Sequence, residues 1–309
     1  MKKKLIVIAG PTGVGKTDLS IKLAKRIGGK IISADSMQVY KKMNIGSAKI
    51  TREEMDGIEH YLIDELEPTE DFNVCRFKSM ADSALKEIYD CGSVPIMVGG
   101  TGFYIQSVLY DIDFDRMDEG GEIRGRLERQ AADEGAQSLW ERLLGVDPES
   151  AQAIHPNNVK RVIRALEFFE LTGKRISEHN ERERAKESPF DYRYYVLTDE
   201  RSRLYERIDA RVDKMVELGL VDEVRALKEE GVRRGMTSMQ GLGYKEIYSY
   251  LEGEISLERA IYLIKRDTRH FAKRQLTWFK REREVVWLDK SKLDENEMIA
   301  EMIKGSDGD

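Results

Sequence analysis

The segment from Leu5 to Ile27 constrains the fold of this chain more than any other. An apolar run, Leu5–Ala9, leads into the glycine-rich segment Gly10–Thr17, and a helical pattern follows from Lys16 to Ile27. This order is typical of a buried parallel strand that feeds a helix. The turn reads GPTGVGKT, which has the spacing of a phosphate-binding P-loop, whose backbone N–H groups surround phosphate oxygens.

The P-loop pattern assigns roles to individual residues. The Lys16 ammonium adds a positive charge beside the phosphate, and the Thr17 hydroxyl is suited to hold Mg²⁺. The motif predicts binding of a phosphate chain and leaves open which reaction follows. The phosphate-binding residues that we expect are Gly10, Pro11, Thr12, Gly13, Val14, Gly15, Lys16 and Thr17.

Short apolar runs recur along the chain with helical patterns between them. We expect further strands at residues 31–33, 60–63, 94–98, 194–197 and 285–288. This alternation predicts an α/β fold, a P-loop NTPase-like open parallel sheet flanked by helices. The alternation lapses over residues 111–189, which are charged and helical in pattern. We therefore expect a core of residues 1–110 and 190–309, with C-terminal helices, and a helical insertion domain of residues 111–189.

Composition narrows the class of protein. The chain of 309 residues is 40% hydrophobic and 35% charged, with a net charge of −6. The apolar run near the start is too short for a signal sequence or a membrane span, so we expect no membrane association. The two cysteines, Cys75 and Cys91, suggest a reducing, cytoplasmic setting without a disulfide framework, and with the histidines they show no zinc-type spacing. Nothing suggests an obligate partner, so we expect a monomer.

Polar residues follow two of the expected strands. Asp35, in SADSMQVY, should lie near the phosphates, where its carboxylate could bind Mg²⁺ or act as a general base; the alternative is an Asx-type turn or a helix cap. Thr101, in VGGTGFY, could hydrogen-bond a reacting atom or cap a helix. The strand VPIMV ends in glycines, whereas P-loop ATPases have a metal-binding Asp there; Asp64, after HYLI, could substitute.

Basic residues gather in two places despite the acidic balance of the chain. Lys160, Arg161 and Arg164 form a ridge on an expected helix of the insertion. Eight lysines and arginines occur between Lys265 and Arg283, against Asp267 and Glu282 alone. The ridge could be a kinase-style arginine lid, a nucleic-acid contact or a solvated face. The C-terminal cluster could contact nucleic acid or be a charged surface helix.

The residues alone support two functions of different kinds. One is a phosphotransferase that uses ATP and Mg²⁺ on a small hydroxylated acceptor. The other is an RNA-modifying transferase whose P-loop holds a diphosphate substrate. The basic C-terminal segment and the missing metal-binding Asp favour the second. A nucleotide switch is disfavoured, because no switch-like threonine and DxxG loop is evident.

Taken together, the motifs resemble those of the tRNA dimethylallyltransferases, also called isopentenyltransferases. The resemblance covers most of the chain, and DSMQVY and TRHFAKRQLTWF are its most specific parts. Met37 and Ile50 depart from the usual pattern, which bears on RNA preference rather than on chemistry. The matching segments are GPTGVGKT, ADSMQVYKKMNIGSAK, EHYLIDELEP, VGGTGFY, HPNNVKRVIRALE, YERIDARVDKMVELGL, QGLGYKEI and TRHFAKRQLTWF.

The resemblance implies a reaction. A dimethylallyl group passes from dimethylallyl diphosphate to N6 of adenosine 37, beside the anticodon of certain tRNAs, and the P-loop holds the diphosphate leaving group. Asp35 would accept the proton of N6, and Thr101 would hydrogen-bond near the same nitrogen. Lys16, Arg211 and Mg²⁺ at Thr17 would stabilise the departing diphosphate.

The resemblance also implies contacts with the anticodon stem-loop of tRNA. To these contacts we add Arg269 and Lys273 of the basic C-terminal segment. The target adenine must leave its stack to react, so we expect it to be flipped into a channel near Asp35. The expected tRNA-binding residues are Asp35, Ser36, Met37, Gln38, Thr101, Val159, Lys160, Arg161, Val162, Ile163, Gln240, Gly241, Gly243, Tyr244, Lys245, Arg269 and Lys273.

Overall fold

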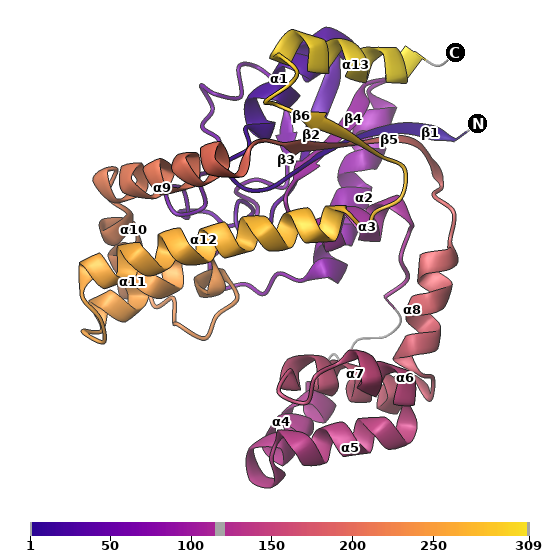
Figure 1. Cartoon of the computed structure of the whole chain (residues 1–309), viewed down its shortest axis with the longest axis vertical. Helices are drawn as coiled ribbons and strands as arrows, with labels where there is room; N and C mark the ends of the chain where they lie inside the picture. The colour runs from indigo at the N-terminus through magenta and orange to yellow at the C-terminus, as the bar shows by residue number, and fades with distance from the viewer. Residues whose placement is uncertain (1, 115–120, 308–309) are drawn as a thin grey trace. The chain divides into compact units, whose positions relative to one another are not determined.

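Six parallel strands form the central sheet of the protein (Figure 1). The structure is a computed structural model that describes residues 2–114 and 121–307. The strand order is β3-β2-β4-β1-β5-β6, and all pairs are parallel. The expected open parallel sheet is confirmed, and each predicted apolar run lies in or overlaps a strand. The strands are β1 (Lys3–Ala9), β2 (Gly29–Ala34), β3 (His60–Tyr61), β4 (Val94–Gly99), β5 (Phe190–Thr198) and β6 (Val285–Asp289).

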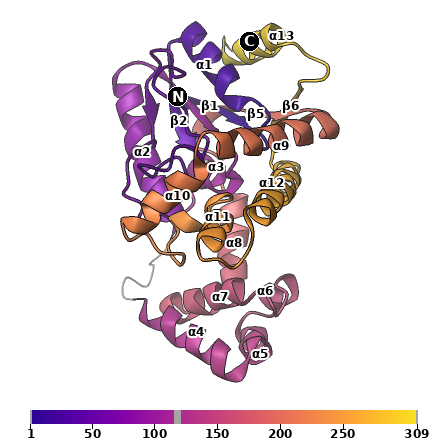
Figure 2. The ribbon, with the colours of Figure 1, turned by 90° about the vertical axis from the view of Figure 1, so that its left-hand side faces the viewer.

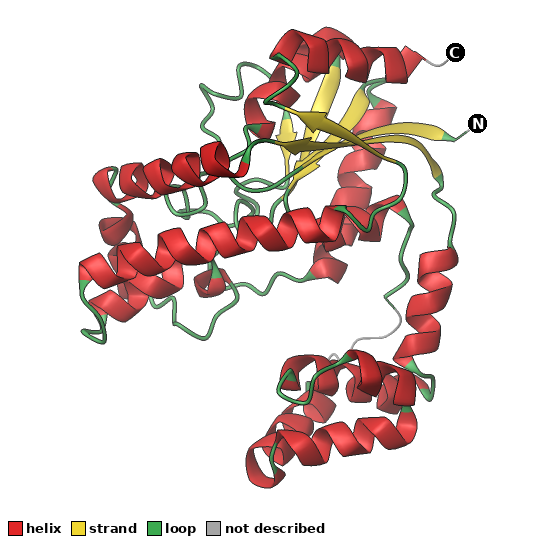
Figure 3. Cartoon of the chain, in the orientation of Figure 1, coloured by secondary structure: helices red, strands yellow, loops and turns green. Residues whose placement is uncertain are grey.

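Helices cover both faces of this sheet (Figures 1 and 3). Helix α1 packs against α13 on one face, and α2 packs against α3 on the other. Ile6, Ile8, Leu23 and Ile96 belong to the apolar core between sheet and helices. These helices are α1 (Lys16–Ile27), α2 (Val74–Asp90), α3 (Gly102–Leu109) and α13 (Glu295–Asp307).

Four further helices and a short 3₁₀ turn connect β5 to β6. The longest, α12, begins at Ser256, whose side chain accepts a hydrogen bond from the Arg259 amide, and it runs alongside α9 and α11 (Figures 1 and 2). Helix α12 also contacts α3, so it lies at the sheet edge where the P-loop ends. The elements are α9 (Arg201–Glu217), α10 (Leu220–Glu229), η1 (Ser238–Gln240), α11 (Tyr244–Leu251) and α12 (Leu257–Phe279).

The chain divides into two compact units. One comprises Met1–Leu109 with Pro189–Asp309, and the other is Tyr110–Ser188. The described part of the second unit holds five helices and no strand, around a core of its own that includes Leu127, Leu143 and Leu166. Its helices are α4 (Glu122–Glu134), α5 (Ala136–Val146), α6 (Pro148–Ala153), α7 (Val159–Thr172) and α8 (Ile176–Ala185). Across the described ranges of both units, every helix is too short or too polar to cross a bilayer.

Candidate active site

The P-loop joins β1 to α1 at the carboxyl edge of the sheet. Gly13 and Gly15 have φ angles of 78° and 90°, which other residues rarely adopt, so the loop can turn its amides inward. The Lys16 ammonium donates to the carbonyl oxygens of Gly10 and Pro11, each at 3.0 Å. Within the described chain it forms no ion pair with a carboxylate. The loop therefore keeps a cation beside its own amides.

Burial changes the titration of this cation. It lowers the pKa of Lys16 to about 8; the charge of Asp35 opposes the shift, and that of Arg211 adds to it. Burial also lowers the pKa of Arg211, on α9, against the opposing charges of Asp35 and Glu54. Lys16, Arg211 and Asp35 thus lie close enough to influence one another. Two desolvated cations beside one carboxylate favour binding of an anion.

Asp35 follows β2, and its two carboxylate oxygens differ in their contacts. Its Oδ1 accepts hydrogen bonds from the backbone amides of Met37 at 2.8 Å and Gln38 at 3.3 Å. This is the Asx-type turn that the sequence left as an alternative. The other oxygen, Oδ2, makes no hydrogen bond to any residue that the structure describes. One oxygen therefore fixes the orientation of the group while the second stays available for a substrate.

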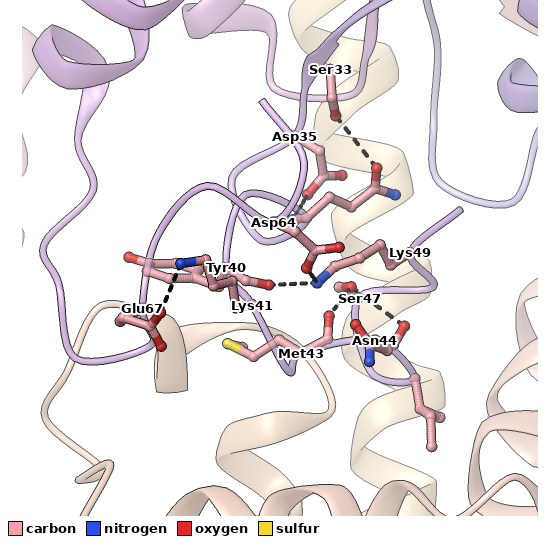
Figure 4. A network of polar contacts seen from close by, with 12 residues as sticks. Ser33, Asp35, Tyr40, Lys41, Met43, Asn44, Ser47, Lys49, Asp64 and Glu67 are labelled. Atoms are coloured by element: carbon pink, nitrogen blue, oxygen red, sulfur yellow. Dashed lines mark hydrogen bonds and ion pairs between the residues drawn. The ribbon is translucent and has the colours of Figure 1, made fainter. Parts of the chain in front are cut away.

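Loop contacts hold the Asp35–Gln38 segment in place (Figure 4). The Lys49 side chain is only 4% exposed, and its ammonium donates to the Tyr40 carbonyl and pairs with Asp64. The Gln38 side chain accepts from the Ser33 hydroxyl and donates to the Ala48 carbonyl, both at 3.3 Å. Asp64 therefore neutralises a buried lysine, and its role as a substitute metal ligand stays a prediction.

Thr101 lies between β4 and α3. Its backbone amide donates to Ala34 at 3.3 Å, and its carbonyl accepts from the amides of Tyr104 and Ile105 at 2.9 and 3.2 Å. Because β2 and β4 pair with Ala34 opposite Gly99, Asp35 and Thr101 emerge from neighbouring strands at the same edge. The half-buried Thr101 is therefore placed beside the residues that follow β2.

Gln275, on α12, is a site residue to which the sequence analysis assigned no role. Its side chain is buried, with Oε1 accepting from the Thr12 amide and Nε2 donating to the Gly100 carbonyl, both at 2.9 Å. One amide group thus joins the P-loop to the turn that carries Thr101. Its motif, TRHFAKRQLTWF, marked the segment as important, but nothing in the residues indicated which group Gln275 would meet.

The basic stretch on α12 is partly neutralised inside the protein. Arg269 pairs with both carboxylate oxygens of Asp209 through Nη1, at 2.5 and 2.7 Å, and Lys265 pairs with Asp213 at 2.6 Å. Both acids belong to α9, so these pairs connect two helices. Lys273 is exposed, and among the described residues its ammonium has no partner. Arg269 therefore has a carboxylate partner within the protein, whereas Lys273 is accessible; contact of either residue with RNA stays a prediction.

Several expected tRNA contacts have buried side chains. Val162 and Ile163 lie in the core of the second unit, and Val159 packs partly against it. The apolar side chains therefore stabilise the insertion, and the two fully buried ones are not accessible to RNA, whereas Lys160 and Arg161 are exposed. Arg164, the third member of the ridge, pairs with Glu167 at 3.2 Å.

Part of the QGLGYK segment is buried as well. Gly241, Gly243 and Tyr244 are buried, and the Tyr244 hydroxyl donates to Glu223 at 2.7 Å. Tyr244 is therefore structural, whereas Gln240 is exposed and Lys245 is half-buried, 3.4 Å from Glu246. Of this segment, Gln240 and Lys245 are the side chains that could reach RNA.

Comparisons with known proteins agree with this arrangement. The sequence profile of the family described as IPP transferase matches residues 38–282, and that of Isopentenyl transferase matches residues 3–72. A tRNA dimethylallyltransferase from Lachnoclostridium phytofermentans is 61% identical over 301 residues, which is 97% of this chain and 96% of that protein.

Solved structures give the same result. The full-length tRNA isopentenylpyrophosphate transferase from Bacillus halodurans is 45% identical with a TM-score of 0.75, covering 99% of this chain and 96% of its own. A eukaryotic dimethylallyltransferase acting on tRNA is 34% identical with a TM-score of 0.81, covering 93% of this chain and 74% of its own. With a site built from a P-loop, a half-buried Arg211 and a carboxylate at Asp35, the chain belongs to the family of tRNA dimethylallyltransferases.

Proposed function

We propose that this protein transfers a dimethylallyl group from dimethylallyl diphosphate to N6 of adenosine 37, beside the anticodon of tRNA. The products are N6-(dimethylallyl)adenosine and diphosphate. The observation that carries the proposal is the grouping of Lys16, Arg211 and Asp35 at the mouth of the P-loop. Two cations suit a diphosphate, and one carboxylate with an available oxygen suits a proton acceptor.

The acceptor step depends on Asp35. The N6 lone pair of adenine is delocalised into the ring, so the amine attacks carbon poorly unless its proton is removed as the bond forms. In the proposed step the N6–C bond forms, the C–O bond to diphosphate breaks with its electron pair leaving on oxygen, and the N6 proton passes to Asp35 Oδ2. The Thr101 hydroxyl would hydrogen-bond near the same nitrogen.

The donor step depends on positive charge at the P-loop. Negative charge develops on the bridging oxygen as diphosphate departs, and fixed donors aimed at it lower the barrier. Lys16, the loop amides and Arg211 would supply this stabilisation. Because the P-loop receives the leaving group, no phosphoryl group is transferred.

We include Mg²⁺ in the proposal on the chemistry of the donor set. Thr17 is exposed at the start of α1, and the part of the chain that the structure describes has no cluster of three His, Cys, Asp or Glu side chains suited to a metal. Mg²⁺ commonly binds through one or two protein oxygens plus substrate phosphates and waters, which fits Thr17 with a diphosphate. The bound ion would supply positive charge to the leaving group.

The RNA would present a single-stranded loop. Sequence-specific RNA recognition usually targets unstacked bases, and a flipped adenine would enter beside Asp35, Ser36, Met37 and Gln38. Lys160, Arg161, Gln240, Lys245 and Lys273 are the accessible polar side chains proposed to contact the anticodon stem-loop. We propose a monomer that acts in the cytoplasm, with the helical unit contributing to tRNA binding.

A two-substrate label experiment tests the proposal. Purified protein, bulk tRNA and Mg²⁺ are given either labelled dimethylallyl diphosphate or γ-labelled ATP. We expect label to enter tRNA from the prenyl donor alone, at an adenosine that nuclease digestion places beside the anticodon. Consumption of ATP without prenyl transfer would instead identify a kinase and refute the proposal.

A further inference from the structure

Lys290 lies against the P-loop although it is 274 positions further along the chain than Lys16. A Cβ atom built on Gly15 would be only 2.8 Å from the Lys290 Nζ atom. The ammonium therefore occupies the space beside Gly15 that a side chain would otherwise fill. Gly15 immediately precedes α1, whose first amides form the phosphate-binding end of the helix.

The backbone fixes where Lys290 begins. It follows β6, whose last residue, Asp289, pairs with Thr198 of β5. The Lys290 amide then donates to the Thr198 carbonyl at 2.9 Å, which extends the parallel pairing by one bond. Lys290 thus starts from the carboxyl edge of the sheet, where ligands of open α/β sheets bind. Its four-carbon side chain gives the ammonium reach from that anchored position.

Lys290 lines a cavity of about 720 Å³. Asp18 and Glu54 also line it, and Glu54 is, after Asp35, the second acid whose charge acts on Arg211. The two other lysines of its wall are neutralised, because Lys22 pairs with Glu295 and Lys25 pairs with Asp56. Neither Asp18 nor Glu54 forms an ion pair with Lys290. Within the described residues, the Lys290 ammonium has neither an ion pair nor a hydrogen bond.

We propose that Lys290 is a third cationic contact for the diphosphate, joining Lys16 and Arg211 from the opposite end of the chain. This inference rests on the proposed function, since it requires a diphosphate in the P-loop. The ammonium would approach the phosphate chain from the β6 side, beside Gly15. It binds the diphosphate of the donor and of the product, and it takes no proton from the adenine.

Direct binding of inorganic diphosphate tests this proposal without requiring turnover. Calorimetric titrations in Mg²⁺ compare the wild-type protein with Lys290→Ala, Lys290→Arg and Lys292→Ala. Lys292 is a matched control, since it lies two residues away, its side chain is 78% exposed, and its partner is Asp289 at 3.6 Å. We expect Lys290→Ala to weaken diphosphate binding about tenfold or more, Lys290→Arg to recover part of the loss, and Lys292→Ala to stay within about twofold.

Steady-state kinetics separate substrate contact from general damage. Lys290→Ala should raise the KM for dimethylallyl diphosphate by a similar factor and leave the KM for tRNA within about twofold. Equal diphosphate affinities for Lys290→Ala and Lys292→Ala would overturn the inference. If the wild-type protein transfers prenyl label but Lys290→Ala binds diphosphate normally, only Lys290 loses its role. If the wild-type protein binds no diphosphate at all, the proposed function fails as well.

Discussion

Cations near the P-loop and cations along α12 differ in whether they pair with a carboxylate. Lys16 is half-buried, bonds only to carbonyl oxygens of its own loop, and has its pKa lowered to about 8. Arg269 and Lys265 on α12 instead pair with carboxylates of α9. Positive charge that the fold leaves without a carboxylate partner is available to a substrate, whereas charge that it neutralises holds helices together. We therefore expect the cations of the first kind to bind ligand and those of the second kind to be structural.

The largest expected effect concerns the carboxylate placed among the unpaired cations. Asp35→Asn keeps an oxygen that can accept from the Met37 and Gln38 amides, so the turn should survive. Turnover should fall by about 10²- to 10⁴-fold, because the amide cannot take the N6 proton. Single-turnover prenyl transfer measures the loss, and calorimetry with inorganic diphosphate should show binding retained. Near-normal turnover would remove Asp35 as the base.

Arg211 tests the cationic side of the comparison. Arg211→Ala should lower the single-turnover rate by roughly a hundredfold, since one charge-stabilising contact to the leaving group is lost. Arg203→Ala is the matched control on the same helix, because Arg203 is 52% exposed and lies 3.5 Å from Asp199. Equal rates for the two variants would place Arg211 with the structural cations.

The lowered pKa of Lys16 predicts a pH dependence with a defined sign. Below about pH 8 the Lys16 ammonium of the free protein is charged and attracts diphosphate. Above that pH the amine has lost its proton, and diphosphate binding must be accompanied by uptake of a proton. Diphosphate affinity should therefore fall above pH 8, by at most about tenfold per pH unit. The same titrations of Lys16→Arg, whose side chain stays charged, show how much of the change comes from ionisation of diphosphate itself. If both proteins follow the same curve, Lys16 is not the titrating group.

The smallest expected effects distinguish Lys273 from Arg269. Lys273→Ala should weaken tRNA binding severalfold and reduce the slope of log K against log salt by about 1, because one phosphate contact is lost. Arg269→Ala should lower thermal stability and leave that slope unchanged, since its partner is Asp209. Filter binding over a salt series measures the slope. A reduced slope for Arg269→Ala would show that Arg269 contacts RNA after all.

Local patterns predicted the strands and the P-loop well. The apolar run Leu5–Ala9 is buried on both faces of a parallel sheet, and residues 94–98 are buried or half-buried there, so their composition alone identifies them. The loop of Gly10–Thr17 likewise carries its geometry in adjacent residues. Where structure depends on neighbours in the chain, the sequence was sufficient.

Contacts across the chain were not predictable in the same way. Nothing near Gln275 indicates that its amide meets Thr12, and nothing near Lys49 indicates that Asp64 neutralises it. The burial of Val162 and Ile163 was a different case, because apolar residues at helical spacing on α7 usually face a core. That signal was present in the sequence, and the family resemblance led us to a different interpretation.

The bond from Thr12 to Gln275 has a consequence for synthesis of the protein. The P-loop leaves the ribosome early, but the side chain that meets its Thr12 amide is 263 residues later. At roughly 5–20 residues per second, about 13 to 50 seconds separate the two. A nascent chain that has finished its first strand, loop and helix therefore still lacks a complete reaction centre. Translation beyond Gln275 is thus expected to be a condition for activity, and chains released before α12 should be inactive.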